Sequence, residues 1–342
     1  MDPISQGALG AVAAASFADR DTVRRAVLIG WVAGMLADAD IFIASPSDPL
    51  LNIEYHRHFS HSLAFIPIGA LVCSAIFWLL ARRRWSLSFR QIYLYALAGY
   101  ASAGLLDACT SYGTRLLWPF SDTRVAWNII SIIDPVFTGG LLLAITIGLL
   151  RRKPAVLRSG LTFAACYLSL GWIQRERTSH LQAELASRRG HSTITQATVK
   201  PSIGNLLLWR SVYRHRDRFH VDAIRTGVVG SPQIYEGTSV PVLTLGSLRG
   251  DLPPDSALAH DLERFDHFSA GYLAHHPHDP GVIGDLRYAA LPQSIKPLWG
   301  IRTNPGNAHA HAAFESFRSV SSDDRDNLLR MLRGESLPPP PE

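Results

Sequence analysis

Long apolar runs alternate with short polar segments through the first half of the chain. A helix that crosses a membrane needs roughly 20 mostly apolar residues. Five runs approach or reach that length, and we predict a membrane span over each of them: residues 26–44, 62–81, 91–109, 129–150 and 156–173. Residues 7–18 are apolar but too short to cross, so they indicate a packed or interfacial helix.

The pattern changes near residue 176, where short apolar stretches begin to alternate with polar ones. Stretches rich in β-branched residues between turn signals predict strands over 206–213, 218–229, 240–245, 282–291 and 296–302. Helical spacing predicts helices over 255–275 and 323–333. We therefore predict a polytopic α-helical membrane domain over residues 1–176 and a soluble α+β domain over residues 177–334. The proline run near the C-terminus predicts a disordered tail over residues 335–342.

Basic residues gather in alternate loops of the membrane domain. They lie before the first span, after the second and after the fourth: Arg20, Arg24, Arg25, Arg82, Arg83, Arg84, Arg90, Arg151, Arg152 and Lys153. The positive-inside rule places these loops on the cytoplasmic side. The chain is then a multi-pass protein of a bacterial inner membrane, with loops 45–61 and 110–128 on the outer face. Arginines beyond the fifth span leave the side of the C-terminal domain open.

Composition narrows the class of protein. Hydrophobic residues make up 47% of the chain and charged residues 18%, which is apolar for a soluble protein. The net charge of +5 is scattered, and no basic run interleaves with aromatics, so we expect no nucleic-acid partner. Three cysteines offer neither a disulfide framework nor a CxxC metal site. The first residues lack a basic region, so we expect no cleaved signal peptide.

A histidine cluster stands directly before the span at 62–81, with His56, His58 and His61 inside six residues. Imidazole is the commonest protein ligand for metals. Carboxylates inside membrane-length apolar segments are costly and are functional candidates by default. Such carboxylates lie near the ends of the other spans: Asp38, Asp40, Asp107 and Asp134. The predicted topology brings all of these groups to the outer face, so the sequence predicts one metal site there.

Spacing limits which residues can be ligands. His56 and His61 are separated by five positions, roughly 140° around a helix, so His56 must lie in the loop and His61 at the helix entry. Asp38 and Asp40 point to different sides of a helix, and only one is expected to contact the ion. We predict the metal ligands His56, His61, Asp38 and Asp107. Mixed imidazole and carboxylate ligands suit a divalent metal such as Zn²⁺ or Mn²⁺.

Several short motifs occur together and in order over roughly the first 150 residues. They are Met1-Asp2-Pro3-Ile4 with Gln6, Asp38-Ala39-Asp40, His56-Arg57 with His61-Ser62, Leu106-Asp107, residues 110–121 and Ile133-Asp134-Pro135. They resemble a family of bacterial inner-membrane proteins described as metal-dependent hydrolases, one branch of which is LexA-regulated. The resemblance implies that His58 is not a required ligand. Many relatives also carry a histidine at the position of Ala103, which is one possible ligand that this chain lacks.

The expected chemistry is hydrolysis by a metal-activated water. Asp40 or Asp134 is the expected general base, although Asp134 before Pro135 is also typical of a helix start. Ser111 and Arg115 are expected to line the site as hydrogen-bond donors. The alternative is a non-catalytic membrane regulator or assembly protein with a structural metal site. A transporter is disfavoured because the acidic residues gather at one edge of the membrane, whereas transport sites lie near its midplane.

Three arginines are expected around the rim of this site: Arg57, Arg115 and Arg124. Guanidinium groups bind phosphate and carboxylate through paired hydrogen bonds. A site at the membrane edge with such a rim favours an anionic amphiphilic substrate, such as a phospholipid or another lipid-linked phosphoester. Membrane lipids are the expected partners. The same arginines could instead anchor the loops to lipid headgroups.

Overall fold

A computed structural model of the chain describes residues 1–227, 231–250 and 252–337. Contacts divide it into two compact units. The first unit holds Met1–Phe42, Tyr55–Ile173 and Ile203–Asn205. The second unit holds Ile43–Glu54, Gln174–Ser202 and Leu206 to the C-terminus. Most of the predicted tail, residues 338–342, lies outside the described residues.

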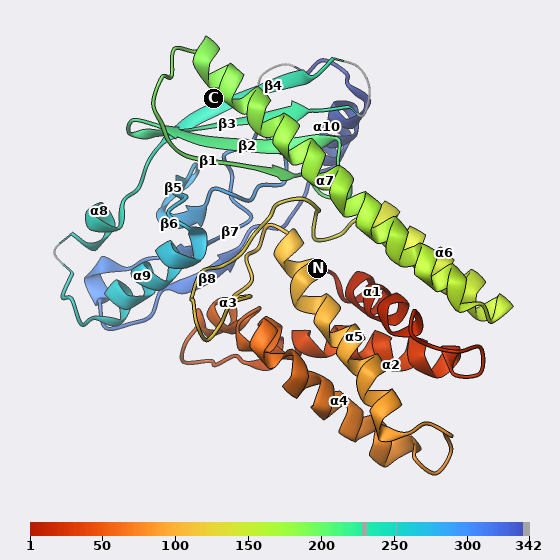
Figure 1. Cartoon of the computed structure of the whole chain (residues 1–342). Coiled ribbons are helices and arrows are strands. Elements are labelled where there is room, and N and C mark those ends of the chain that lie inside the picture. Colours follow the sequence, from red (N-terminus) through yellow and green to blue (C-terminus); the bar gives the residue numbers. More distant parts are fainter. Residues whose placement is uncertain (228–230, 251, 338–342) are drawn as a thin grey trace. The chain divides into compact units, whose positions relative to one another are not determined.

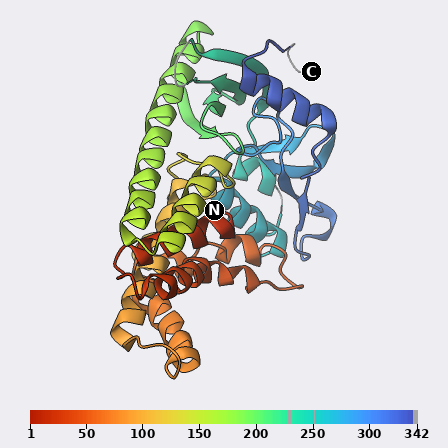
Figure 2. The ribbon, with the colours of Figure 1, turned by 90° about the vertical axis from the view of Figure 1, so that its right-hand side faces the viewer.

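The first unit is helical (Figure 1). Its helices are α1 (Pro3–Ala15), α2 (Val23–Leu36), α4 (Ile66–Ala81), α5 (Phe89–Cys109), α6 (Pro135–Arg151) and the part of α7 (Pro154–Arg188) that ends at Ile173. α6 and α7 run side by side (Figure 2), and the ring of Phe163 packs on Gly140 at their contact. α1 is almost wholly buried, as expected for a packed helix that is too short to cross a membrane.

Three helical segments are long and apolar enough to cross a membrane by length and composition: Leu63–Ala81, Phe89–Cys109 and Pro154–Arg188. The predicted span over residues 129–150 is only partly helical, because Asp134 caps a helix that begins at Pro135, and the resulting α6 is apolar but shorter than these three. The predicted span over residues 26–44 is wrong as a continuous helix, because α2 ends at Leu36 and a 3₁₀ helix follows over Ala37–Phe42. The tighter turn carries Asp38 and Asp40 into a polar network, which the apolar run could not show.

Glycines bring α1, α2 and α5 into backbone contact. A Cβ atom on Gly10 of α1 would collide with the carbonyl oxygen of Gly30 in α2. A Cβ atom on Gly99 of α5 would lie 2.6 Å from that same oxygen. Small residues allow this close approach between helices of membrane proteins. The contact places the start of α1 beside the ends of α2 and α5.

The second unit contains two four-stranded antiparallel sheets with the orders β1-β2-β3-β4 and β5-β6-β7-β8. The first sheet holds β1 (Ile194–Pro201), β2 (Leu208–His215), β3 (Arg218–Arg225) and β4 (Gln233–Pro241). The second holds β5 (Leu273–His276), β6 (Asp279–Asp285), β7 (Trp299–Arg302) and β8 (Ala313–Ser316). The helices are α3 (Leu51–Tyr55), which ends one residue beyond this unit, α8 (Leu245–Arg249), α9 (Ala257–Ser269) and α10 (Ser322–Arg333).

A helical region followed by a sheet-containing α+β region is therefore confirmed. The predicted strands at 206–213 and 218–229 correspond to β2 and to β3, which ends at Arg225, and residues 228 and 229 lie outside the described residues. The predicted strand at 240–245 is wrong in place, because β4 ends at Pro241 and α8 begins at Leu245. The strands β1 and β8 were not predicted. The predicted helix over 255–275 is wrong at its end, because α9 stops at Ser269 with Ala270 in the left-handed conformation and β5 begins at Leu273. Phe219 and Tyr272 stack at 5.4 Å between ring centroids in the core of this unit.

Candidate metal centre

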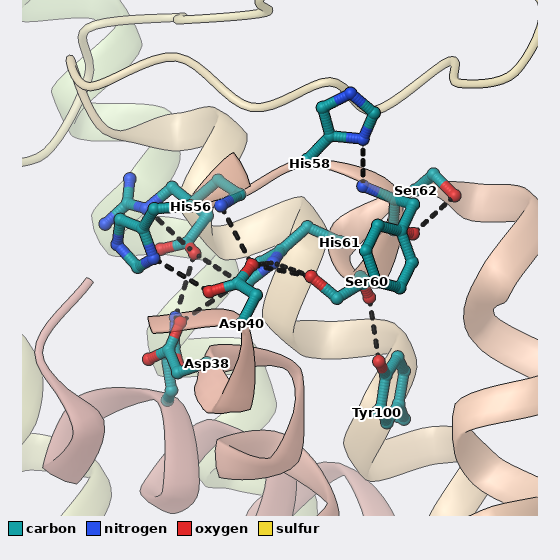
Figure 3. A network of polar contacts seen from close by, with 12 residues as sticks. Asp38, Asp40, His56, His58, Ser60, His61, Ser62 and Tyr100 are labelled. Carbon is teal, nitrogen blue, oxygen red and sulfur yellow. Dashed lines mark hydrogen bonds and ion pairs between the residues drawn. The ribbon is translucent and has the colours of Figure 1, made fainter. Parts of the chain in front are cut away.

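The candidate site forms where three helices of the first unit begin or end. Asp38 and Asp40 follow α2, the histidine cluster precedes α4, and Asp107 lies in the last turn of α5. Figure 3 shows Asp38, Asp40, His56 and His61 turned toward one another. Residues 56–62 form a turn that carries the three histidines, and we call it the histidine turn. Ser62 ends it, and the Ser62 hydroxyl accepts a hydrogen bond from the Phe65 N–H at the entry to α4.

His61 is the centre of this network. Its side chain is fully buried, and Nε2 lies 3.1 Å from Asp38 Oδ1 and 3.0 Å from Asp107 Oδ2. Nδ1 lies 3.1 Å from Asp40 Oδ2. Burial alone would lower the pKa of His61, but the hydrogen bonds to Asp107, Asp38 and Asp40 outweigh it and raise the pKa to about 10. A metal ion at Nε2 would therefore displace a tightly held proton.

Asp40 holds both outer histidines of the cluster. Its Oδ1 lies 2.8 Å from His56 Nδ1, and its Oδ2 accepts hydrogen bonds from the Arg57 N–H at 2.9 Å and the Ser60 hydroxyl at 2.6 Å. Burial would raise the pKa of Asp40, but the hydrogen bonds from His56 and His61 hold it well below the usual range. A carboxylate so stabilised is a weak base, so its position suits orientation of the imidazoles better than the general-base role expected of it.

Asp107 is completely buried among an amide donor and two cationic groups. Gln6 Nε2 lies 2.9 Å from its Oδ2, Arg57 Nε lies 3.2 Å from the same oxygen, and the Met1 amino group pairs with its Oδ1. Arg57 is only 3% exposed, and its Nη1 donates to Thr110 Oγ1 at 2.7 Å. The expectation that Arg57 lies on the rim is wrong, because this guanidinium balances a buried carboxylate.

At this site, two groups of side chains bring possible ligand atoms within 4.8 Å of one another. The first group is Asp38, His61 and Asp107, and the second is Asp38, Asp40 and His56. Asp38 belongs to both. The structure therefore brings together all four residues that the sequence predicted as metal ligands. It also adds Gln6, which the residue pattern alone did not single out as part of the site.

Residues 1–178, which hold every residue of the candidate site, match the YdjM inner membrane protein family. The chain belongs to this family. The resemblance seen in the sequence motifs is thereby confirmed, and so is the assignment to an inner-membrane protein.

Two curated proteins are similar to parts of this YdjM-family chain. Inner membrane protein YbcI of Escherichia coli (strain K12) is 31% identical over 112 residues, which cover 32% of the chain and 62% of YbcI. Uncharacterized protein YfhP of Bacillus subtilis (strain 168) is 28% identical over 145 residues, which cover 42% of each protein. The chain thus spans less than two thirds of the length of either relative. No solved structure matches it.

Asp134 lies apart from both ligand groups of the YdjM-family segment. It caps α6, accepting hydrogen bonds from the N–H groups of Val136 at 3.1 Å and Phe137 at 3.0 Å. The Tyr167 hydroxyl lies 2.9 Å from both of its carboxylate oxygens. These contacts favour the helix-start interpretation of Asp134-Pro135 over a role as general base.

The remaining predicted residues lie in the loop after α5. Ser111 is buried immediately beyond the end of that helix. Arg115 Nη1 lies 2.6 Å from His58 Nε2 and 3.1 Å from Asp122 Oδ1. His58 belongs to neither ligand group, although it lies between His56 and His61 in the sequence. Its contacts connect the loop containing Arg115 to the histidine turn.

Proposed function

We propose that this protein is a membrane-bound hydrolase that uses a divalent metal, Zn²⁺ or Mn²⁺, held by His and Asp side chains. The observation that carries the proposal is the environment of His61. Its Nε2 faces two carboxylates, while its Nδ1 is held by a third, Asp40. A ligating histidine in metalloproteins typically has such a second partner, which fixes its tautomer and ring orientation.

The donor set fits a divalent ion. Ligand atoms around an ion at about 2.0–2.2 Å are separated from their neighbours by roughly 2.9–3.5 Å. His61 Nε2 lies 3.1 Å from Asp38 Oδ1 and 3.0 Å from Asp107 Oδ2, so these atoms already have that spacing. His56 and Asp38 would serve the second group. When bound, the metal supplies a water of lowered pKa and polarises the bond that is cleaved.

Asp38 is the carboxylate best placed to move a proton. Its side chain is 18% exposed, whereas the side chains of Asp40 and Asp107 are 1% and 0% exposed. Its Oδ1 faces His61 and Gln6, and among the described residues no group donates a hydrogen bond to its Oδ2. Asp38 Oδ2 is therefore the general base of the proposal, in place of Asp40 or Asp134.

The substrate of the proposed reaction is an anionic amphiphile, such as a phospholipid or another lipid-linked phosphoester. His61 lies two positions before the span Leu63–Ala81, and Asp107 lies near the end of the span Phe89–Cys109. The site thus belongs to the edge of the apolar segments, where a polar headgroup with an apolar tail resides. Arg115 would supply the guanidinium for the headgroup. With the basic loops on the cytoplasmic side, this edge is the outer one.

The alternative proposal is a non-catalytic regulator or assembly protein with a structural metal site. One observation favours it: Asp40 and Asp107 are buried and already surrounded by donors from the protein. A site that serves only to hold helix ends together needs no exposed base and no room for substrate. Activity of the purified protein separates the two proposals.

The experiment begins with metal content. Full-length protein in detergent is loaded with Zn²⁺ or Mn²⁺, and the bound metal is measured by elemental analysis for wild type, His61→Ala, Asp107→Asn and the control His58→Ala. We expect strong loss in the first two variants and none in the control. Equal metal in all four proteins would refute a metal centre at this site.

Activity is then measured on anionic phospholipid, neutral phospholipid and a soluble phosphoester. Turnover of anionic lipid that is lost in Asp38→Asn supports the hydrolase. Arg115→Ala should lower turnover of the anionic lipid while the bound metal is retained. Stoichiometric metal without hydrolysis of any substrate would favour the structural alternative.

A further inference from the structure

Gln6 lies in the second turn of α1 with its side chain completely buried. Its Nε2 is 2.9 Å from Asp107 Oδ2 and 3.4 Å from Asp38 Oδ1, the two carboxylates of the first ligand group. Its Oε1 is buried and accepts no hydrogen bond from the residues that the structure describes. A buried carbonyl oxygen without a partner is unfavourable, so this one requires an explanation.

The amide end of Gln6 has the position of a fourth ligand. His61 Nε2 and the amide end of Gln6 each approach the same two carboxylate oxygens. Four of the six edges of the tetrahedron formed by these atoms are 3.1, 3.0, 2.9 and 3.4 Å long. These lengths are those of neighbouring ligand atoms around one ion, roughly 2.9–3.5 Å. The amide end of Gln6 therefore lies at distances from the two carboxylates similar to those of His61 Nε2.

The orientation of the amide depends on whether a cation is present. Without one, Nε2 must face the carboxylates of Asp38 and Asp107, because Oε1 in that position would repel them. A half-turn about the terminal bond of the side chain exchanges the two atoms with almost no change in shape. That exchange places Oε1 at the fourth corner, where it gains the partner it lacks.

We infer that Gln6 Oε1 is a ligand of the ion held by Asp38, His61 and Asp107, and that it shifts the preference of the site toward Mn²⁺. This inference rests on the proposed metal-dependent function. With Gln6 the donor set contains three oxygens and one nitrogen. Oxygen ligands suit Mn²⁺, whereas added imidazole nitrogen favours Zn²⁺. An amide oxygen in place of another histidine therefore narrows the preference for Zn²⁺ over Mn²⁺.

The test compares full-length wild type with Gln6→Glu, Gln6→Leu and Gln6→His in detergent. Affinities for Mn²⁺ and Zn²⁺ are measured by competition with a chelating indicator, and folding of the metal-free proteins is checked by circular dichroism. If Gln6 is a ligand, Gln6→Glu retains or tightens Mn²⁺ binding, and Gln6→Leu weakens it by about tenfold or more. Gln6→His raises the ratio of Zn²⁺ to Mn²⁺ affinity by a similar factor.

The glutamate variant decides between ligation and simple support. If Gln6 only donates from Nε2 to Asp38 and Asp107, a glutamate there repels both carboxylates, and Mn²⁺ binding falls in Gln6→Glu as it does in Gln6→Leu. Weakening in both variants, or no change in either, overturns the inference and leaves the hydrolase proposal intact. Failure of the folded wild-type protein to bind either metal overturns both.

Discussion

His56 Nδ1 lies 2.8 Å from Asp40 Oδ1, although the two residues are 16 positions apart and the segment between them belongs largely to the other unit. That segment, Ile43–Glu54, is held within the second unit by Arg264 of α9. Arg264 binds both carboxylate oxygens of Asp48 at 3.0 Å and lies 2.8 Å from Glu54 Oε2. The loop that connects two residues of the candidate site is therefore anchored outside the helical unit.

Replacing Arg264 with leucine should destabilise the second unit. Asp48, Glu54 and the fully buried Asp261 would then lose their shared cation. Because the pair with Asp48 is partly exposed, we expect a loss of about 1–3 kcal/mol in the free energy of unfolding. Thermal and denaturant unfolding in detergent measure it. The exposed Arg325 of α10 offers a matched control, since Arg325→Leu should change stability by less than about 0.5 kcal/mol. Equal effects of the two substitutions would contradict the anchoring role.

Removing the charge of Asp40 should weaken metal binding without removing a ligand of the first group. In Asp40→Asn the amide cannot accept from both His56 Nδ1 and His61 Nδ1 as the carboxylate does. Loss of such a supporting partner typically lowers metal affinity by about 10–100-fold. Competition titration with a chelating indicator measures the change, and Asp122→Asn at the exposed loop position is the control. Unchanged affinity in Asp40→Asn would show that the imidazoles are oriented by other contacts.

Stability of the second unit should fall in mild acid through His220. This ring lies 4.3 Å from the ring of His191, and burial, followed by His191 and Arg189, lowers its pKa to about 4, against a smaller opposing effect of Asp222. Because the folded pKa lies below the unfolded value of about 6.5, the unfolded chain binds more protons between these limits. The contribution of His220 is therefore complete above about pH 6.5 and is lost as the pH falls toward 4.

Unfolding measured from pH 7.5 to 4.5 tests this sign. His220→Gln should flatten the dependence in that window, whereas the exposed His260→Gln should leave it unchanged. His215 and Asp222 also act on the pKa of His220, so the measurement includes His215→Gln. An unaltered slope in His220→Gln would assign the acid sensitivity to other groups.

Cysteine labelling tests the predicted orientation. Single cysteines at the exposed positions Ser47, Ser86 and Thr123 are placed in a chain from which the three native cysteines have been removed. We expect an impermeant reagent to label Ser47→Cys and Thr123→Cys in intact spheroplasts, and Ser86→Cys only after lysis. Position 86 is chosen because the neighbouring Ser88 caps α5. The reverse pattern would move the candidate site to the cytoplasmic side.

The convergence of histidines and aspartates could be predicted from the sequence because each lies near an end of an apolar run. His61 lies just before the apolar segment Leu63–Ala81, and Asp107 lies near the end of Phe89–Cys109, so the ends of these two segments locate both residues. Gln6 and Arg57 could not be identified in this way. Their positions at Asp107 depend on the packing of α1 and of the histidine turn against α5, which no single segment encodes.

The C-terminal end of α2 could not be predicted from the hydropathy pattern either. Residues 26–44 have the composition of a span, but hydrogen bonding of Asp38 and Asp40 to the histidines favours a tighter turn after Leu36. In the second unit, β2 and β3 were predictable because they are almost continuously buried. The strand β8 pairs with β7 at the edge of its sheet and has no buried residue, so its short polar sequence carries little signal.

The backbone contact of Gly10, Gly30 and Gly99 has a consequence for how the protein responds to different lipids. Helices adapt to bilayer thickness by tilting, and the cost depends on what each helix packs against. α1, α2 and α5 cannot slide past one another without separating backbones that touch, whereas the span that contains α4 exposes most of its apolar surface. A change in bilayer thickness should therefore tilt α4 relative to the rigid group of α1, α2 and α5. Lipid composition would then change access to the histidine turn before α4, while the carboxylates at the ends of α2 and α5 stay in place.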